Sequence, residues 1–200
     1  MLYEILRGTA RLALRRYYAD VVVQGRQHIP GDAPLLVVAN HPNALVDAML
    51  VATAVRRRVF ITARATLFES RLLAGFLRRI GVVPLLRVQD APSAASPTGF
   101  LSRNDASIQR VTDALYKREV VLVFPEGISH DSPTMAPLKS GVARIALQAR
   151  DLGIQALTIV PVGLVYEARS VCRVTCWCGS ALRSASMRGA WNIRPVVPGH

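Results

Sequence analysis

Two short stretches of the sequence combine side chains that could move a proton. In the first, His41 lies six positions before Asp47, within the run NHPNALVD. A histidine can take a proton near neutral pH, and a neighbouring carboxylate can hold its tautomer and stabilise the imidazolium. The pair therefore suits general base chemistry. The alternative is a histidine satisfied by the backbone, with Asp47 capping the helix that follows.

The second stretch is FPEGISHD, at residues 124–131. A glutamate, a glycine turn and a hydroxyl at the end of a strand can line a polar pocket and orient a hydroxyl or a phosphate. The residues in these positions are Glu126, Gly127 and Ser129. The alternative is an ordinary corner between a strand and a loop, where proline and glycine are common.

Both stretches follow short apolar runs that predict buried strands. Such runs alternate with segments of helical period, which is typical of an α/β fold with a mostly parallel central sheet flanked by helices. Side chains at the carboxyl ends of such strands meet at one edge of the sheet. The predicted strands are 34–40, 58–63, 82–87, 120–124, 157–165 and 171–177. The predicted helices are 1–18, 43–55, 68–80, 102–118 and 140–152.

Two further local signals concern the helices. Two prolines, together with serines, alanines and a glycine, predict a loop over 90–99, and the spacing of Ser102 and Asp105 predicts a capping box at the next helix. On the first helix, Arg7, Arg11 and Arg15 form one stripe opposite an apolar side. A basic amphipathic helix of this kind can lie in a membrane interface, and the alternative is an ordinary surface helix packed on the core.

Composition limits the class of protein. With 200 residues and 51% hydrophobic content, the chain predicts one compact domain and excludes a disordered one. The longest apolar run, 44–55, contains Asp47 and is shorter than the ~18 residues of a spanning helix. Glu4 and Arg7 interrupt the region where a secretory signal would lie. We therefore expect a cytosolic protein or one on a cytosol-facing membrane.

The formal charge of +12 fits two kinds of partner, nucleic acid or an anionic membrane with phosphate-bearing substrates. Aromatic residues make up 6% of the chain and are not clustered, which disfavours a nucleic-acid surface. We expect three segments: 1–26 as an amphipathic helix and lead-in, 27–168 as the main domain, and 169–200 as an atypical basic tail.

The segment after Glu167 has five arginines, no acidic residue and all three cysteines of the chain. A solvated basic tail and a terminal strand with a loose end are two interpretations. A third hypothesis is that the reading frame slips near Arg169, or that the chain is truncated, because out-of-frame GC-rich DNA encodes such a composition.

Four blocks, in order, resemble those of the glycerolipid acyltransferases, which acylate glycerol 3-phosphate and lysophosphatidic acid. The blocks are NHPNALVD, RVFITARATLFE with GVVPLLR, VFPEGIS, and IVPVGL, and the resemblance covers residues 27–166. Two features depart from the common pattern: five residues rather than four separate His41 from Asp47, and the usual arginine after Pro-Glu-Gly is absent. Both resemble the branch typified by fungal glycerol-3-phosphate/dihydroxyacetone-phosphate acyltransferases. We expect the turn at Pro42 to absorb the extra residue.

The resemblance implies transfer of a fatty acyl group from a thioester to an alcohol, in phospholipid synthesis. It implies that His41 is the general base, that Asp47 orients it, and that strand-end amides stabilise the oxyanion. No metal, cofactor or covalent intermediate is implied; the donor is acyl-CoA or acyl carrier protein, and the acceptor is a glycerol phosphate or a lysophospholipid. The enzyme is expected on the cytoplasmic face of a membrane, as a peripheral protein, without a nucleic-acid partner.

The acceptor phosphate needs a cation, and Arg87 at the end of the third predicted strand is the first choice. Arg64 and Lys139 are second choices, and the alternative for Arg87 is a surface arginine. Glu126 and Ser129 are expected either to bond the acceptor hydroxyls or to brace the loop.

Other classes fit less well. Ser129, His130 and Asp131 cannot form a hydrolase triad, because adjacent side chains diverge, and no Gly-x-Ser-x-Gly elbow is present. A metal site on His41, Asp47, Glu126 and His130 matches no ligand spacing, nor does zinc on Cys172, Cys176 and Cys178. A catalytically inactive membrane scaffold stays open, although the intact His41 and Asp47 disfavour it.

Overall fold

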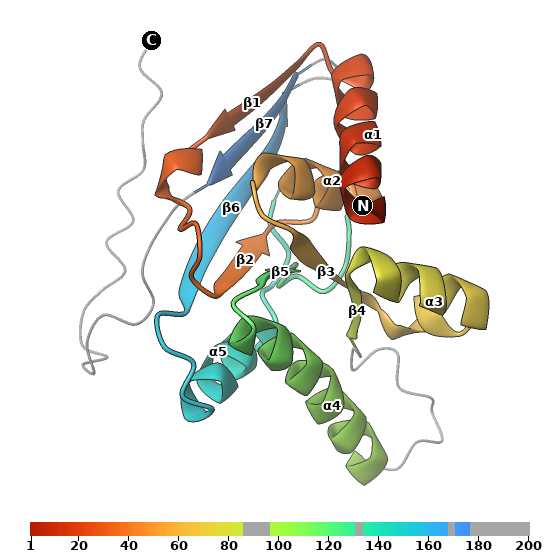
Figure 1. Cartoon of the computed structure of the whole chain (residues 1–200), viewed down its shortest axis with the longest axis vertical. Coiled ribbons are helices and arrows are strands. Elements are labelled where there is room, and N and C mark those ends of the chain that lie inside the picture. The colour runs from red at the N-terminus through yellow and green to blue at the C-terminus, as the bar shows by residue number, and fades with distance from the viewer. Residues whose placement is uncertain (86–96, 131–133, 168–170, 177–200) are drawn as a thin grey trace.

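The computed structural model describes residues 1–85, 97–130, 134–167 and 171–176. Within these ranges, strands form one sheet in the order β1-β7-β6-β2-β5-β3-β4 (Figure 1). The elements, in chain order, are α1 Leu2–Tyr17, β1 Asp20–Gln24, η1 Arg26–His28, β2 Leu35–Ala39, α2 Ala44–Ala54, β3 Val59–Arg64, η2 Ala65–Phe68, α3 Arg71–Ile80, β4 Val82–Leu85, α4 Pro97–Tyr116, β5 Val120–Val123, α5 Gly141–Asp151, β6 Thr158–Glu167 and β7 Val171–Cys176.

Five adjacent strands, β6, β2, β5, β3 and β4, run parallel to one another. At one side, β7 pairs antiparallel with β6 and parallel with β1. The predicted α/β class with a mostly parallel sheet is therefore confirmed, and so is the N-terminal helix. The β7 strand also confirms the terminal strand expected at 171–177, over the residues that the structure describes.

The central strands are buried on both faces, as their unbroken apolar runs predict. In β2, Leu35 and Val37 pack into the core on the side of α1 and α2, whereas Leu36 packs into the core on the side of α4 and α5. All three side chains are fully buried. This rigid layer ends at Ala39, and the site residues follow it directly.

Two sequence-based expectations about elements are wrong. Strand β1 was not predicted, because its three valines lie in a short run that is stabilised by pairing with the remote β7. Helix α4 begins at Pro97, so residues 97–99 of the predicted loop and the predicted capping box at Ser102 lie inside the helix, whereas residues 90–96 of that loop lie outside the described residues. Proline fits the first turn of a helix, where its missing N–H has no intrahelical partner.

Two of the three arginines in the α1 stripe contact α2, whereas Arg15 is exposed. The guanidinium of Arg7 donates to the carbonyls of Val55 and Arg56, and Arg11 donates to that of Thr53 at 3.2 Å. These carbonyls lie at the C-terminal end of α2, where the helix has no basic residue of its own. Cations stabilise that end of a helix because of its partial negative charge. The stripe thus joins α1 to α2, which favours the packed surface helix of the two interpretations.

Candidate active site

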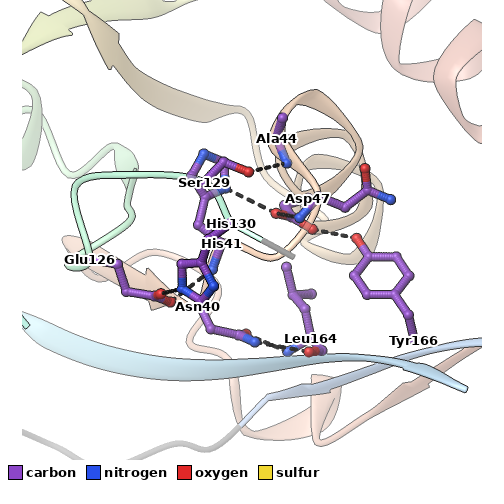
Figure 2. Close-up of polar contacts among 10 residues, drawn as sticks. Asn40, His41, Ala44, Asp47, Glu126, Ser129, His130, Leu164 and Tyr166 are labelled. Carbon is purple, nitrogen blue, oxygen red and sulfur yellow. Dashed lines mark hydrogen bonds and ion pairs between the residues drawn. The ribbon is translucent and has the colours of Figure 1, made fainter. Parts of the chain in front are cut away.

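The loop between β2 and α2 brings His41 and Asp47 into contact. The Nδ1 atom of His41 lies 2.9 Å from Oδ2 of Asp47, which is completely buried in the first turn of α2 (Figure 2). The extra residue between them is accommodated just before and at the helix start, where Ala44 has a φ of 37°. Positive φ is sparsely populated for alanine, so the turn stores some strain. The five-residue spacing is therefore compatible with a direct contact.

Three donors surround the carboxylate of Asp47. Its Oδ2 atom also accepts the backbone N–H of Asn43 at 2.7 Å, and its Oδ1 atom accepts the hydroxyl of Tyr166. A carboxylate can only accept hydrogen bonds, so these partners fix its orientation towards His41. Tyr166 lies at the far end of β6, and the sequence assigned it no role.

The imidazole of His41 is oriented by this contact and by a stacked ring. It lies on Phe124, with ring centroids 3.8 Å apart and an angle of 16° between the planes. Because Nδ1 faces a carboxylate, the neutral ring carries its proton there and has a lone pair on Nε2. Among the described residues, Nε2 has no hydrogen-bond partner, and the side chain is 13% exposed. This atom is available to a substrate.

Glu126 binds the protein with both of its oxygens. Its Oε1 atom accepts the backbone N–H of His41 at 3.0 Å, and Oε2 accepts Nε2 of His130 and the N–H of Ala136, the latter at 3.1 Å. Its side chain is 1% exposed. Burial alone would raise the pKa of this carboxyl, but the hydrogen bonds from His130, Ala136 and His41 lower it below its usual value. Of the two roles expected for Glu126, this geometry favours bracing of the loop.

The two predicted stretches are joined at further points. The Oγ atom of Ser129 accepts the N–H of Ala44 at 2.9 Å, and the N–H of His130 donates to the carbonyl of His41 at 3.2 Å. Gly127, between Glu126 and Ser129, makes the turn of this loop with a φ of 71°, a conformation that favours glycine. A Cβ at this position would lie 3.6 Å from Cγ of Lys139, whose backbone N–H donates to the carbonyl of Pro125 at 2.8 Å.

The predicted cations lie around this edge of the sheet. Arg64 ends β3 and is exposed. If the registers of β2 and β3 on β5 are extended past their last pairs, Arg64 comes level with Asn40 at two strand spacings, about 10 Å. Lys139 is exposed beside Gly127. Arg87 and Asp131 lie outside the described residues.

Asn40 is a second residue to which the sequence assigned no role. Its side-chain amide donates to the carbonyl of Leu164 at 2.9 Å and accepts the N–H of Leu164 at 2.7 Å. The amide thereby continues the pairing of β2 with β6 by one step and holds the start of the His41 loop on the sheet (Figure 2). Only the long-range strand pairing reveals this role, so no local signal could have found it.

Several backbone amides expected to stabilise an oxyanion already have partners. Those of His41, Asn43 and Ala44 donate to side chains of the site, and that of Gly127 donates to the carbonyl of Phe124. An oxyanion therefore needs a donor other than these four groups.

Two negative findings apply to the described ranges. No three histidine, cysteine, aspartate or glutamate side chains there lie close enough together to hold a metal ion. No helix in them is both long enough and apolar enough to cross a bilayer.

The structure thus places a His–Asp pair and a buried Pro-Glu-Gly turn together at one edge of an α/β sheet. The chain belongs to the acyltransferase family, whose model matches residues 20–165. It is 30% identical to the bovine 1-acyl-sn-glycerol-3-phosphate acyltransferase alpha over 184 residues, covering 91% of this chain and 55% of the relative. It is 41% identical to glycerol-3-phosphate O-acyltransferase 2 of Saccharomyces cerevisiae over 68 residues, 34% of this chain and 9% of that protein.

The fold also has a solved counterpart. The crystal structure of the 1-acyl-sn-glycerophosphate acyltransferase PlsC from Thermotoga maritima matches with a TM-score of 0.66 and 19% identity, covering 92% of this chain and 71% of that chain. The chain spans about half the length of the mammalian relatives that it matches.

Proposed function

We propose that the protein transfers a fatty acyl group from a thioester to a hydroxyl of a glycerol-phosphate acceptor. The observation that carries this proposal is the contact between His41 and the buried Asp47, with Nε2 directed away from the pair. Membership of the acyltransferase family and the printed activities of the relatives support it.

The geometry suits general base catalysis. Nε2 of His41 takes the hydroxyl proton as the acceptor oxygen attacks the thioester carbonyl, and Asp47 stabilises the imidazolium that forms. The carbon–sulfur bond then breaks, and the imidazolium returns the proton to the leaving thiolate. The protein forms no covalent intermediate in this sequence of steps.

The exposed cations give the acceptor a place to bind. Arg64 lies at the end of β3 and Lys139 lies beside Gly127 in the loop after β5, and the guanidinium of the one or the ammonium of the other can bind a phosphate. Arg87 comes after β4 in the sequence, and β4 is the neighbour of β3 in the sheet. Arg87 remains a predicted ligand of the same phosphate.

The test is thiol release from palmitoyl-CoA in the presence of liposomes, with glycerol 3-phosphate or lysophosphatidate added. We expect acceptor-dependent release that falls by about 10²–10⁴-fold in His41→Ala. Assays without acceptor measure plain hydrolysis, and thermal melts show whether the variant is folded. Equal activity of a folded His41→Ala variant would refute the role of the histidine, and an inactive, folded wild type would favour the scaffold alternative.

A further inference from the structure

Helix α3 has a strongly amphipathic sequence, RLLAGFLRRI. At 100° per residue, Leu72, Leu73 and Phe76 fall on one side and Arg71 and Arg78 on the opposite one, whereas Arg79 falls at the border, next to Leu72. A surface helix of a globular protein normally turns such an apolar side towards the core.

Helix α3 does so only in part: Ala74 is buried and Leu77 and Ile80 are half-buried, but the rest of its apolar side is exposed. Leu72 is 89% exposed, Phe76 45% and Leu73 43%, and Ala74 is its only residue that is buried. Leu67 in the preceding turn η2 is also exposed. Figure 1 shows α3 projecting from the edge of the molecule beside β4, the last strand of the sheet. An apolar side of this size, exposed at an edge, indicates an interaction surface.

The charges beside the apolar side indicate what it binds. Arg71, Arg78 and Arg79 are all exposed, and the helix contains no acidic residue. An apolar stripe with arginines alongside is typical of helices that lie in the interface of an anionic bilayer. A purely apolar protein partner would give these three arginines no counter-charge.

The position of α3 also matters. Turn η2 follows Arg64, which lies level with the His41 loop at the same edge of the sheet. Helix α3 begins at Arg71, shortly after η2 ends at Phe68, so its N-terminal end with Leu72 starts near that edge of the sheet. A bilayer in contact with it would present lipid headgroups to that edge.

We propose that Leu72, Leu73 and Phe76 form a lipid-contacting face on α3 that inserts into the interface of an anionic membrane, with the arginines of the helix at the headgroups. The role of this face in delivering a lipid acceptor to His41 rests on the proposed function. The binding of the face to a membrane does not depend on that function. The face on α3 replaces the arginine stripe of α1 as the membrane surface, since Arg7 and Arg11 are engaged by α2.

The test is flotation of the full chain with vesicles of phosphatidylcholine, with or without phosphatidic acid. We expect Leu72→Ser with Phe76→Ser to weaken binding to the anionic vesicles by about tenfold or more, because two apolar side chains no longer leave water. The matched control is Leu12→Ser with Tyr17→Ser on α1, whose residues are also exposed, at 62% and 69%, and whose loss should leave binding unchanged.

Each contrary outcome is decisive. Loss of binding in the α1 variant alone would place the membrane surface on α1 and overturn the proposal. Equal binding by wild type and both variants would also overturn it. Binding that does not require phosphatidic acid would remove the role of the arginines and so refute the proposal as stated.

A second assay separates this proposal from the proposed function. With a short-chain acyl-CoA and soluble glycerol 3-phosphate, the α3 variant should keep wild-type kcat and KM, whereas His41→Ala should not. If wild type binds vesicles through α3 but transfers no acyl group, the lipid-contacting face stands and the proposed function fails.

Discussion

The carboxylate of Asp47 is buried and is surrounded by three hydrogen-bond donors. All three contacts require that both of its oxygens accept hydrogen bonds. In Asp47→Asn, the amide nitrogen can face Nδ1 of His41 and favour the wrong tautomer, with the proton on Nε2. We expect kcat to fall by about 10²–10⁴-fold with little change in KM, as measured by steady-state thiol release.

The control is Tyr166→Phe, which removes one donor to Asp47 but leaves the carboxylate. It should cost about 1 kcal/mol of stability and far less activity than the asparagine variant. Equal losses of kcat in the two variants would contradict an orienting role for the aspartate.

The depressed pKa of Glu126 predicts a pH-dependent contribution to stability. A group with a folded-state pKa below its unfolded value of 4.5 stabilises the fold above that pH, and the contribution is lost as the pH falls through the folded pKa. Glu126→Gln should therefore lower Tm at neutral pH, and its difference from wild type should shrink below about pH 4.5.

The measurement is a series of thermal melts between neutral and acidic pH. His130 is the titratable side chain that bonds Glu126 in the described structure, so His130→Asn serves as the companion variant. A constant difference in Tm between wild type and Glu126→Gln at every pH would refute the prediction.

At the scale of elements, the joint between α1 and α2 can be tested by one substitution. Arg7 is 12% exposed and donates to two carbonyls that otherwise lack a cation. Arg7→Met keeps the apolar body but removes the donors, so we expect a loss of about 1–3 kcal/mol in the free energy of unfolding.

Chemical denaturation measures that loss, with Arg16→Met as the matched control on the exposed side of the same helix. The control should change the free energy of unfolding by less than about 0.5 kcal/mol. A similar effect of both substitutions would show that net charge, rather than the capping of α2, is what stabilises the helix.

The elements differ in how well the sequence predicts them. The strands β2 and β5 were predicted because a strand buried on both faces needs an unbroken apolar run, and both have one. Strand β1 was missed because its partner β7 lies at the other end of the described chain. A helical wheel could not predict the orientation of the α1 arginines either. It shows which side chains cluster on one side of a helix but not which side faces the core.

The site divides in the same way. Contact between His41 and Asp47 is local, six residues apart, and the sequence indicated it. The roles of Asn40 and Tyr166 depend on contacts across 124 and 119 residues, which only the assembled sheet brings about. Glu126 is an intermediate case. The sequence predicted that a glutamate at this position belongs to the site, but only the hydrogen bonds of its two oxygens show that bracing the loop is favoured over binding the acceptor.

At the scale of the whole molecule, the charge of +12 should favour substrates rich in phosphate. We expect the KM for a short-chain acyl-CoA to rise several-fold between low and physiological ionic strength, with kcat nearly constant, because salt screens long-range attraction. An acyl-pantetheine thioester without phosphates is the control donor, and its KM should not change. A KM for acyl-CoA that is independent of salt would contradict the prediction.

The side chain of Asn40 has a consequence for the stability of the sheet. Strand β6 continues past the end of β2, so the N–H and C=O of Leu164, a buried residue, would otherwise lack a strand partner on that side. The amide of Asn40 bonds both groups. The residue that begins the candidate active site thus also spares the sheet two unsatisfied backbone groups, each of which would cost about 1–3 kcal/mol.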